Sequence, residues 1–509
     1  MSTHPLLMPR PRAARKKSAS ILDIVLDAAQ EAAVVRPSGN ALLILGEAGH
    51  GKTTVAIRRL AHLWRRARCA RCTRGSQTTL RAAVVVPNEG LARSLQPMLR
   101  QLGVDVEALT YDRWASLQAR RAFRRLPPES EETPPSVMRL KRHPSLALAL
   151  EELAKREPGR IDDDDDRPVQ RRALATRGDL QHLFGDSVLL ERVRANALLP
   201  SRSVLDTLER TQRQFRPRAK DEWAHVTDRQ RLVAIDHKDL DEGTASEAAG
   251  TVDVEDYAVL FELARLRANA SKRALPKRNL YDVLLLDEAQ ELAPLELRLL
   301  GQSLVPGGTL LVAGDADQQT DEASAFQSWE ATMTDLGHPV HDTVRFEIGY
   351  RCPPDVVALA HRALGCARIE EAHAGSCFAF HDEAACLARL TIELRRLLRA
   401  DSRASIALVC RSPLAARRAV AHLHANEVAA RLVFDGRFFA RGAVQVTTVS
   451  EVKGLEFDFV LVADASASVY PDDRGSRRAM YVAITRARHQ AVLASPGEPT
   501  PLLPRSCWV

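Results

Sequence analysis

The sequence lacks any apolar run of the roughly 20 residues that a membrane-spanning helix requires, so we expect neither a spanning segment nor a membrane partner. Aromatic residues are also scarce, at 5% of the chain, so any base-stacking surface would depend on a few rings. The eight cysteines are scattered and form no disulfide-like framework. This pattern fits a reducing compartment and predicts a cytoplasmic protein.

Residues 1–20 carry five basic side chains, no acidic one and no apolar core of a secretory signal. We expect a disordered basic arm, which could contact phosphates or simply act as a solubilising tail. Cys69 and Cys72 have the spacing of half a zinc site, but no second pair lies nearby. The alternative is an ordinary loop after the first helix.

The length of 509 residues allows two to four domains. There are 72 basic residues against 65 acidic ones, and this small excess permits a polyanionic partner without requiring one. Short apolar runs flanked by turn residues are typical of strands buried on both faces of parallel α/β sheets. They are Ala41–Leu45, Ala82–Val86, Val283–Leu286, Thr309–Ala313, Ser405–Val409, Val444–Thr448, Phe459–Ala463 and Ala491–Ala494.

These runs fall into two groups, which predicts two α/β domains. The interval 120–280 differs in character, with a Pro/Glu-rich linker at 127–135 and a run of five acids at 162–166. Helical patterns cover Val188–Phe215, with Leu205 on an apolar face, and Asp253–Ala270. We therefore expect a mostly helical insertion within the first α/β domain.

A complete phosphate-binding loop, Gly46-Glu47-Ala48-Gly49-His50-Gly51-Lys52-Thr53, joins the first apolar run to a helical stretch at Val55–Leu63. Gly46, Gly49 and Gly51 allow backbone N–H groups to close around phosphates, with Thr54 following in the helix. Lys52 is predicted to reach the β- and γ-phosphates of ATP, and Thr53 to ligate Mg²⁺.

Downstream, Asp287 and Glu288 follow four apolar residues and so are predicted at the C-terminal edge of a strand. Asp287 can hold Mg²⁺, and Glu288 can polarise the attacking water. The segment Gly314-Asp315-Ala316-Asp317-Gln318 also follows a strand-like run, and Gln318 suits a sensor of the γ-phosphate. Trp329, farther along, could stack on a base or belong to the core.

The last third contains Tyr350-Arg351, Lys453-Gly454-Leu455-Glu456-Phe457 and Tyr481-Val482-Ala483-Ile484-Thr485-Arg486-Ala487. Arginine suits bidentate contact with a developing phosphoryl charge. In chain order, these segments together resemble the motif set of superfamily 1 helicases of the UvrD/Rep type. The segments Val86-Pro87-Asn88, Leu109-Thr110-Tyr111-Asp112, Gly314-Asp315 and Lys453-Gly454-Leu455-Glu456 also resemble the smaller HelD-like branch.

The resemblance runs from about residue 30 to residue 488 and implies a role for each matching residue. Arg351 and Arg486 would be catalytic fingers from the second domain, with Glu288 and Gln318 catalytic in the first. Tyr350 would stack on the base and Glu456 would bond the ribose. Gln30 would read adenine, although its segment could equally form an ordinary helix face.

The resemblance further implies two RecA-like P-loop domains. The first would comprise 21–119 and 281–343, the helical insertion 120–280, and the second domain 344–509. A further insertion in the second domain would be minimal or absent, because the interval from Arg351 to Thr448 suffices only for that domain itself.

The expected activity is ATP-dependent translocation or unwinding on single-stranded DNA or single/double-strand junctions, with 3′–5′ polarity, in DNA repair or recombination. Two alternatives stay open. One is a HelD-like remodeller with RNA polymerase as its partner, and the other is the motor subunit of an anti-phage complex with other protein partners.

Overall fold

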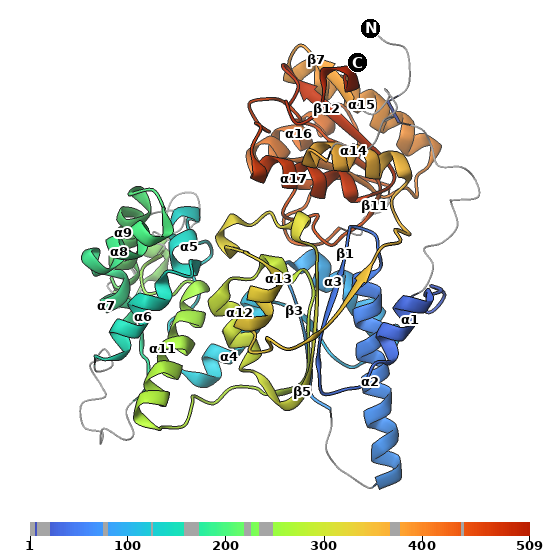
Figure 1. Ribbon diagram of the computed structural model, residues 1–509. Coiled ribbons are helices and arrows are strands. Elements are labelled where there is room, and N and C mark those ends of the chain that lie inside the picture. The colour runs from blue at the N-terminus through green and yellow to red at the C-terminus, as the bar shows by residue number, and fades with distance from the viewer. Residues whose placement is uncertain are drawn as a thin grey trace.

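The computed structural model describes residues 6–7, 21–74, 80–123, 126–156, 173–217, 225–233, 248–366, 377–438 and 442–509. Two six-stranded, all-parallel sheets organise this part of the chain (Figure 1). The first has the order β3-β2-β4-β5-β1-β6. Its strands are β1 (Ala41–Gly46), β2 (Ala82–Val86), β3 (Ala108–Thr110), β4 (Tyr281–Leu286), β5 (Leu304–Gly314) and β6 (Asp342–Phe346).

Successive residues of these strands face opposite sides of the sheet, and both sides are covered by helices. Leu42 and Ile44 pack in one core, whereas Leu43 and Leu45 pack in the other. The first face carries α1 (Ala28–Val35), α2 (Lys52–Arg74) and α3 (Glu89–Gln101). The second carries α4 (Tyr111–Ala122), α11 (Glu255–Ser271), α12 (Pro294–Gly301) and α13 (Trp329–Asp335). We call this unit the first lobe.

The second lobe is built on the sheet β7-β12-β11-β8-β10-β9. Its strands are β7 (Cys377–Phe380), β8 (Ile406–Cys410), β9 (Ala430–Leu432), β10 (Val444–Thr448), β11 (Phe457–Val462) and β12 (Ala487–Pro496). One face packs α14 (Pro354–Leu364) and α17 (Arg474–Thr485), and the other packs α15 (Glu383–Ala400) and α16 (Pro413–Ala425). The predicted α/β class with two parallel sheets is confirmed.

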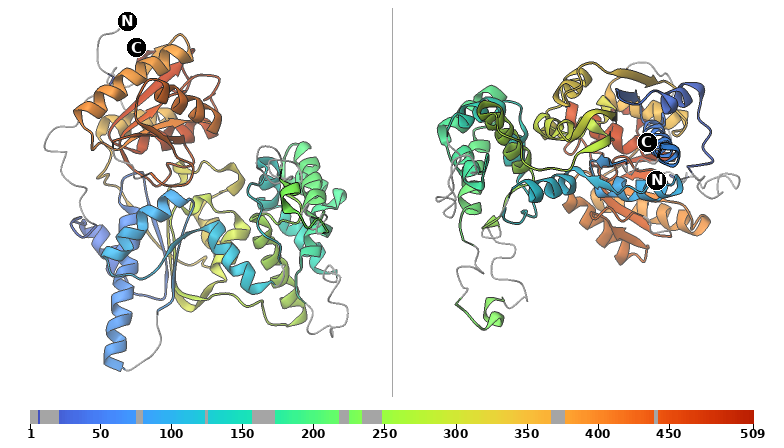
Figure 2. Two further views of the ribbon diagram at one scale, coloured as in Figure 1. Left: turned by 180° about the vertical axis from the view of Figure 1, so that it is seen from behind. Right: turned by 90° about the horizontal axis from the view of Figure 1, so that it is seen from below.

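A group of helices lies beside the first lobe and is drawn in cyan to green (Figure 1). It comprises α5 (Pro135–Arg142), α6 (Leu146–Ala154), α7 (Arg177–Phe184), α8 (Ser187–Ala197) and α9 (Arg202–Gln214). We call it the insertion, because it lies between α4 and α11 in the chain. Figure 2 shows from behind and from below that it stands apart from the second lobe.

The predicted continuous helical stretch 188–215 is wrong at its middle. Leu198 adopts a left-handed conformation, with φ of 53°, and Pro200 follows it, so α8 ends there and α9 begins anew. Because α9 starts anew, Val204 faces the core, whereas Leu205, which was predicted on an apolar face, is 61% exposed. The other expected helix, Asp253–Ala270, closely matches α11, which begins at Glu255.

The edge strand β6 lies partly beyond position 343, where the first domain was expected to end. It pairs in parallel with β1 from Leu42↔Asp342 to Gly46↔Phe346, so the first sheet ends at Phe346. Helix α4 likewise crosses the boundary expected at 119. In the described residues between Arg351 and Thr448, every strand belongs to the second sheet and every α-helix packs on it.

Of the expected basic arm, only Leu6 and Leu7 are described. They are buried against the core of α15 and α16, and their carbonyls accept bonds from Gln490 and Arg396, so these two residues are ordered rather than disordered. The rest of that arm, the acid run 162–166 and the Cys72 side chain lie outside the described residues. None of the described helices has the length and apolarity needed to cross a membrane.

Candidate active site

A cleft of about 1460 Å³ lies where the C-terminal edge of the first sheet meets the second lobe. Its lining brings together most of the site residues predicted from sequence. They are Gln30, Gly49, Gly51, Lys52, Thr53, Thr54, Glu288, Gln318, Tyr350, Arg351, Glu456 and Arg486. Segments separated by hundreds of residues thus share one cavity.

The phosphate-binding loop turns between β1 and the first residue of α2. Gly49 and Gly51 have φ values of 85° and 81°, which side chains other than glycine rarely adopt. Lys52 Nζ bonds back to the carbonyls of Gly46 and Glu47, at 2.7 and 2.9 Å. Burial lowers the pKa of Lys52, although Asp315, 4.0 Å away, acts in the opposite sense. The ammonium is therefore held inside the loop that precedes it.

Two carboxylates end β4 beside this loop. Thr53 Oγ1 donates to Asp287 Oδ2 at 2.7 Å, and Gln290 Nε2 donates to Glu288 Oε2 at 2.6 Å. Glu288 has a left-handed backbone, with φ of 56°. Such strain in a residue other than glycine clusters at functional sites. Burial, reinforced by Glu288, raises the pKa of Asp287 to about 7.

A chain of hydrogen bonds then links the lobes. Asp315, after β5, accepts from Gln318 Nε2 at 2.6 Å, and Gln318 Oε1 accepts from Arg486 at the end of α17. Arg486 is 1% exposed, and its Nε also donates to the Val482 carbonyl at 3.1 Å. Burial, together with nearby Arg351, lowers the pKa of Arg486. The second lobe therefore delivers a buried cation directly to the residue predicted to sense phosphate.

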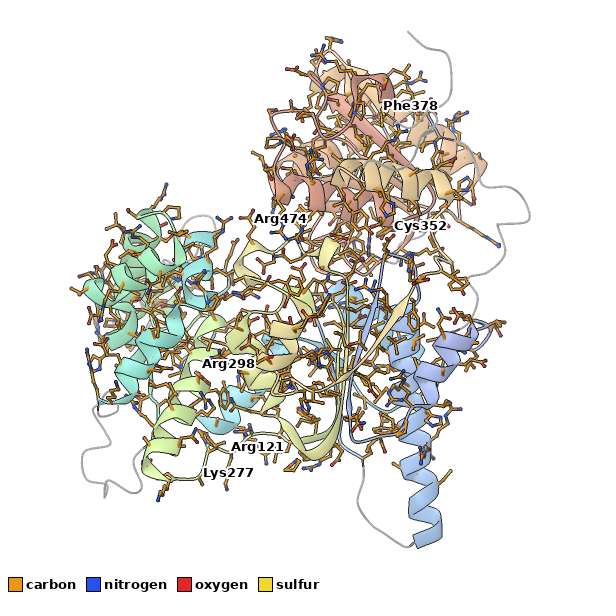
Figure 3. All side chains as sticks on the ribbon, viewed as in Figure 1. Arg121, Lys277, Arg298, Cys352, Phe378 and Arg474 are labelled. Carbon is orange, nitrogen blue, oxygen red and sulfur yellow. The ribbon has the colours of Figure 1, made fainter. Side chains whose placement is uncertain are left out.

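Arg351 approaches the loop from the segment joining the lobes. A Cβ on Gly49 would lie only 2.9 Å from Arg351 Cβ, so a side chain at this position would displace the arginine. Arg351 Nη1 donates to Glu456 Oε1 at 2.9 Å. Burial lowers the pKa of this guanidinium, but Glu456 outweighs it and raises the pKa overall. The neighbouring Cys352 is labelled at the junction of the lobes (Figure 3).

Gln30 and Tyr350 also contact the loop, at His50 and at Gly49. Gln30 Nε2 donates to the His50 carbonyl at 3.1 Å, and the residue also forms a capping box with Asp27 at the start of α1. Tyr350 is 57% exposed, and its hydroxyl donates to Asp27 Oδ2 at 2.7 Å. The Tyr350 amide donates to the Gly49 carbonyl at 3.1 Å. These contacts place a glutamine amide and a phenol ring at one edge of the cleft.

Comparison with known protein families decides the identity. A family model described as an AAA domain matches residues 30–324, more than half of the chain, and one described as the UvrD-like helicase C-terminal domain matches residues 443–494. The chain belongs to the UvrD-like superfamily 1 helicases. The helicase is accordingly an ATP-dependent enzyme, and the expectation from its motifs is confirmed at this level.

Among solved structures, the helicase is similar to the C-terminal domain of a possible DNA helicase from Lactobacillus plantarum WCFS1. The two share 20% sequence identity, and the match covers 32% of this chain and 98% of that chain with a TM-score of 0.28. Comparison with curated proteins gave no match.

Several contacts of the helicase between the lobes were not predicted, including the pair of His361 Nε2 and Glu47 Oε2 at 2.9 Å. Lys453 Nζ lies 2.8 Å from Glu291 Oε2, and Arg478 donates to Gln319 Oε1. Lys453 lies within a quoted motif and Glu291 lies three residues after Glu288, but nothing in the sequence indicates that they meet. The position of Arg478 could have been predicted from the sequence. It precedes Arg486 by eight residues, so the two side chains lie near the same face of the helix.

Trp329 of the helicase belongs to the core rather than to a base-stacking surface. It is 9% exposed and packs edge-on against Phe326, with ring centroids 5.1 Å apart. A Cβ on Gly314 would lie 2.2 Å from the Trp329 ring, so the indole fills the space behind that strand end. Within the described residues, no group of histidine, cysteine and acidic side chains forms a metal cluster.

Proposed function

We propose that this helicase is an ATP-driven translocase on single-stranded DNA that moves 3′ to 5′ and serves cytoplasmic DNA repair or recombination. The observation that carries the proposal is the buried bond from Arg486 of the second lobe to Gln318 of the first. Gln318 is bonded to Asp315, and Asp315 lies 4.0 Å from Lys52. One cleft therefore contains groups from both lobes that, in this proposal, bind phosphate.

The residues at the loop fit a magnesium ion together with a nucleoside triphosphate. The Thr53 hydroxyl and the Asp287 carboxylate lie 2.7 Å apart and offer the hard oxygen ligands that Mg²⁺ prefers. When bound, the metal neutralises charge on the β- and γ-phosphates. In this proposal Lys52 binds the same phosphates, while Gln290 orients Glu288 to accept the proton of the attacking water.

Substrate binding would also control the relative position of the lobes. Arg351 and Arg486 can contact a γ-phosphate bound at Lys52 only when the second lobe lies against the first. ATP therefore favours the closed arrangement of the lobes. Hydrolysis removes that differential contact, and the lobes can separate. If single-stranded DNA crosses both lobes, alternating closure and opening produces directional stepping.

The test is ATP turnover by the wild type and by Lys52→Ala, measured alone and with single-stranded DNA, duplex DNA or RNA. We expect stimulation by single-stranded DNA that falls steeply with salt, and no turnover by the variant under any condition. Lys277→Ala is the matched control, since this exposed lysine is labelled far from the junction of the lobes (Figure 3).

Turnover that is indifferent to every nucleic acid but rises with purified RNA polymerase would overturn the proposal. That result would favour the remodelling activity of the HelD-like branch.

A further inference from the structure

Helix α2 has two halves with different surroundings. In the first half Val55, Ile57 and Leu60 are fully buried against the first sheet. From Trp64 onward the described side chains are partly or fully exposed. Figures 1 and 2 agree that this end of the helix extends past the sheet, away from the second lobe. We call residues 64–69 the α2 tip.

The charged side chains of this helix are all basic. Lys52–Arg74 contains seven arginines and no acidic residue, and positions 48–88 contain no aspartate or glutamate at all. Two of these arginines have partners outside α2, and Arg65 Nε donates to the Ala61 carbonyl of its own helix at 3.3 Å. Arg59 donates to carbonyls including that of Ala33, and Arg58 donates to Ile24 O at 2.6 Å. The remaining described ones, Arg65, Arg66 and Arg68, are exposed on the tip.

No carboxylate in the described part of the chain forms an ion pair with Arg65, Arg66 or Arg68. Elsewhere exposed arginines commonly have one, as in Arg113–Glu107 at 3.1 Å. Like charges one turn apart destabilise an isolated helix. The pKa of His62 is lowered by burial and by Arg66 and Arg65, which is consistent with a positive potential at the tip. The tip therefore suits a polyanion.

We propose that the α2 tip binds the phosphate backbone of duplex DNA, at a second nucleic-acid contact outside the ATP cleft. This rests on the proposed function, because a translocase on one strand meets duplex at a junction. The tip offers no exposed ring beyond the half-buried Trp64, whereas non-specific single-strand binding uses aromatic stacking.

The shape of the tip also favours a duplex. A helix with its side chains is about 10–12 Å wide, close to the width of about 12 Å of the B-DNA major groove. Arg68 lies sixteen residues beyond Lys52, which places the contact about 24 Å along the helix from the phosphate loop. A duplex bound there does not compete with ATP.

The experiment compares the wild type with the triple variant Arg65→Gln/Arg66→Gln/Arg68→Gln. Affinity is measured by fluorescence anisotropy for a blunt duplex, a single strand and a duplex with a 3′ single-stranded tail, over a range of salt. The matched control is Arg202→Gln/Arg231→Gln/Arg505→Gln. It removes the same charge at residues that are 85%, 80% and 95% exposed and that each lie near an acid.

We expect the tip variant to lose about tenfold or more in duplex affinity. Its salt slope should fall by roughly 2–3, at about 0.9 per lost phosphate contact. The tip variant should match the wild type in its affinity for single-stranded DNA, in its ATP turnover stimulated by single-stranded DNA and in its thermal midpoint of unfolding. The control variant should match the wild type in every one of these measurements.

Equal duplex affinity and salt slope in the wild type and the tip variant would overturn the inference. An equal loss on the single strand would also overturn it, because the occupant would then not be a duplex. A third contradicting result would be a wild type that does not bind duplex DNA and whose tip binds an acidic protein instead. Failure of the proposed function is distinguishable, because it appears as wild-type turnover that single-stranded DNA does not stimulate.

Discussion

Arg351 and Arg486 reach the same cleft from different surroundings, and we propose different roles for them on this basis. Arg351 pairs with Glu456. Burial alone would raise the pKa of Glu456, but the charge of Arg351 holds that pKa below its usual range. Arg486 has no carboxylate among its hydrogen-bond partners in the described residues, and it is held by carbonyl, amide and hydroxyl oxygens. A guanidinium held by neutral acceptors keeps its charge available for a phosphoryl group.

Arg486→Ala should lower kcat by about 10³-fold or more while changing ATP affinity only severalfold, because a finger acts mainly on the transition state. Steady-state turnover and nucleotide titration measure the two effects separately. Arg474→Ala is a suitable control, since Arg474 is exposed at the other end of the same helix (Figure 3). Parallel losses of binding and turnover would contradict the assignment.

At the scale of elements, α5 joins the insertion to the first lobe through buried charge. Lys141 lies 2.9 Å from Asp253 and 2.6 Å from Asp256, and all three are almost fully buried. The next residue, Arg142, donates to Glu296 and Asp321 of the first lobe. Breaking such a buried pair is costly because one charge is left without compensation. The insertion is therefore attached firmly at this helix.

Glu255, in the first turn of α11, makes the folding stability of the protein depend on pH. It is 7% exposed and accepts from Thr133 Oγ1 at 2.9 Å, and burial raises its pKa from 4.5 to about 7. The unfolded chain releases this proton near its ordinary pKa, whereas the folded chain retains it up to about pH 7. The folded state thus binds more protons across this window, and stability falls as pH rises.

Glu255→Gln should therefore stabilise the protein at pH 8 by on the order of 2 kcal/mol and leave stability near pH 4.5 almost unchanged. Denaturant unfolding at the two pH values measures the difference. Glu31→Gln, at an exposed position in the first turn of α1, is the control. The same increment at both pH values would show that ionisation is not the cause.

At the scale of the whole molecule, the ion pair Lys453–Glu291 links the lobes outside the phosphate-binding groups. Glu291 also accepts from the Thr320 and Asp321 amides, at 2.9 and 3.1 Å, so it holds the segment after Gln318. This arrangement connects lobe position to Gln318, the proposed phosphate sensor. Contacts that form only when the lobes are close can couple the two.

Lys453→Ala should reduce the stimulation of turnover by single-stranded DNA severalfold while ATP affinity stays close to the wild type. The expected cause is weaker closure of the lobes, since the lysine touches no phosphate-binding group. Stimulated and basal turnover are compared, with exposed Lys272→Ala as the control. Full stimulation in Lys453→Ala would exclude a coupling role.

The isolated protein should unwind long duplexes poorly. In the described residues between Arg351 and Thr448 the chain builds only the second sheet and its covering helices, with no additional domain to engage duplex ahead of the motor. Strand displacement on duplexes of increasing length measures this. Processive unwinding by the purified protein alone would refute it.

Prediction from sequence succeeded where the signal is contiguous. The apolar runs of β1, β2, β4 and β10 are nearly the observed strands, because burial on both faces demands unbroken apolar residues. The four edge strands, β3, β6, β7 and β9, were missed, since edge strands are short and partly solvated. Leu205 was misplaced because a break at Leu198 reset the phase of the helix.

The amino-acid sequence by itself predicted the ATP-dependent activity and the α/β class of this helicase. Both depend on residues adjacent in the chain, as in the loop from Gly46 to Thr53. Only the tertiary structure decided which distant groups meet, such as Arg486 with Gln318 and Lys453 with Glu291, and which end of α2 remains outside the core. The physical reason is that local sterics and hydrophobic periodicity act over a few residues, whereas pairing across a cleft depends on how whole sheets pack.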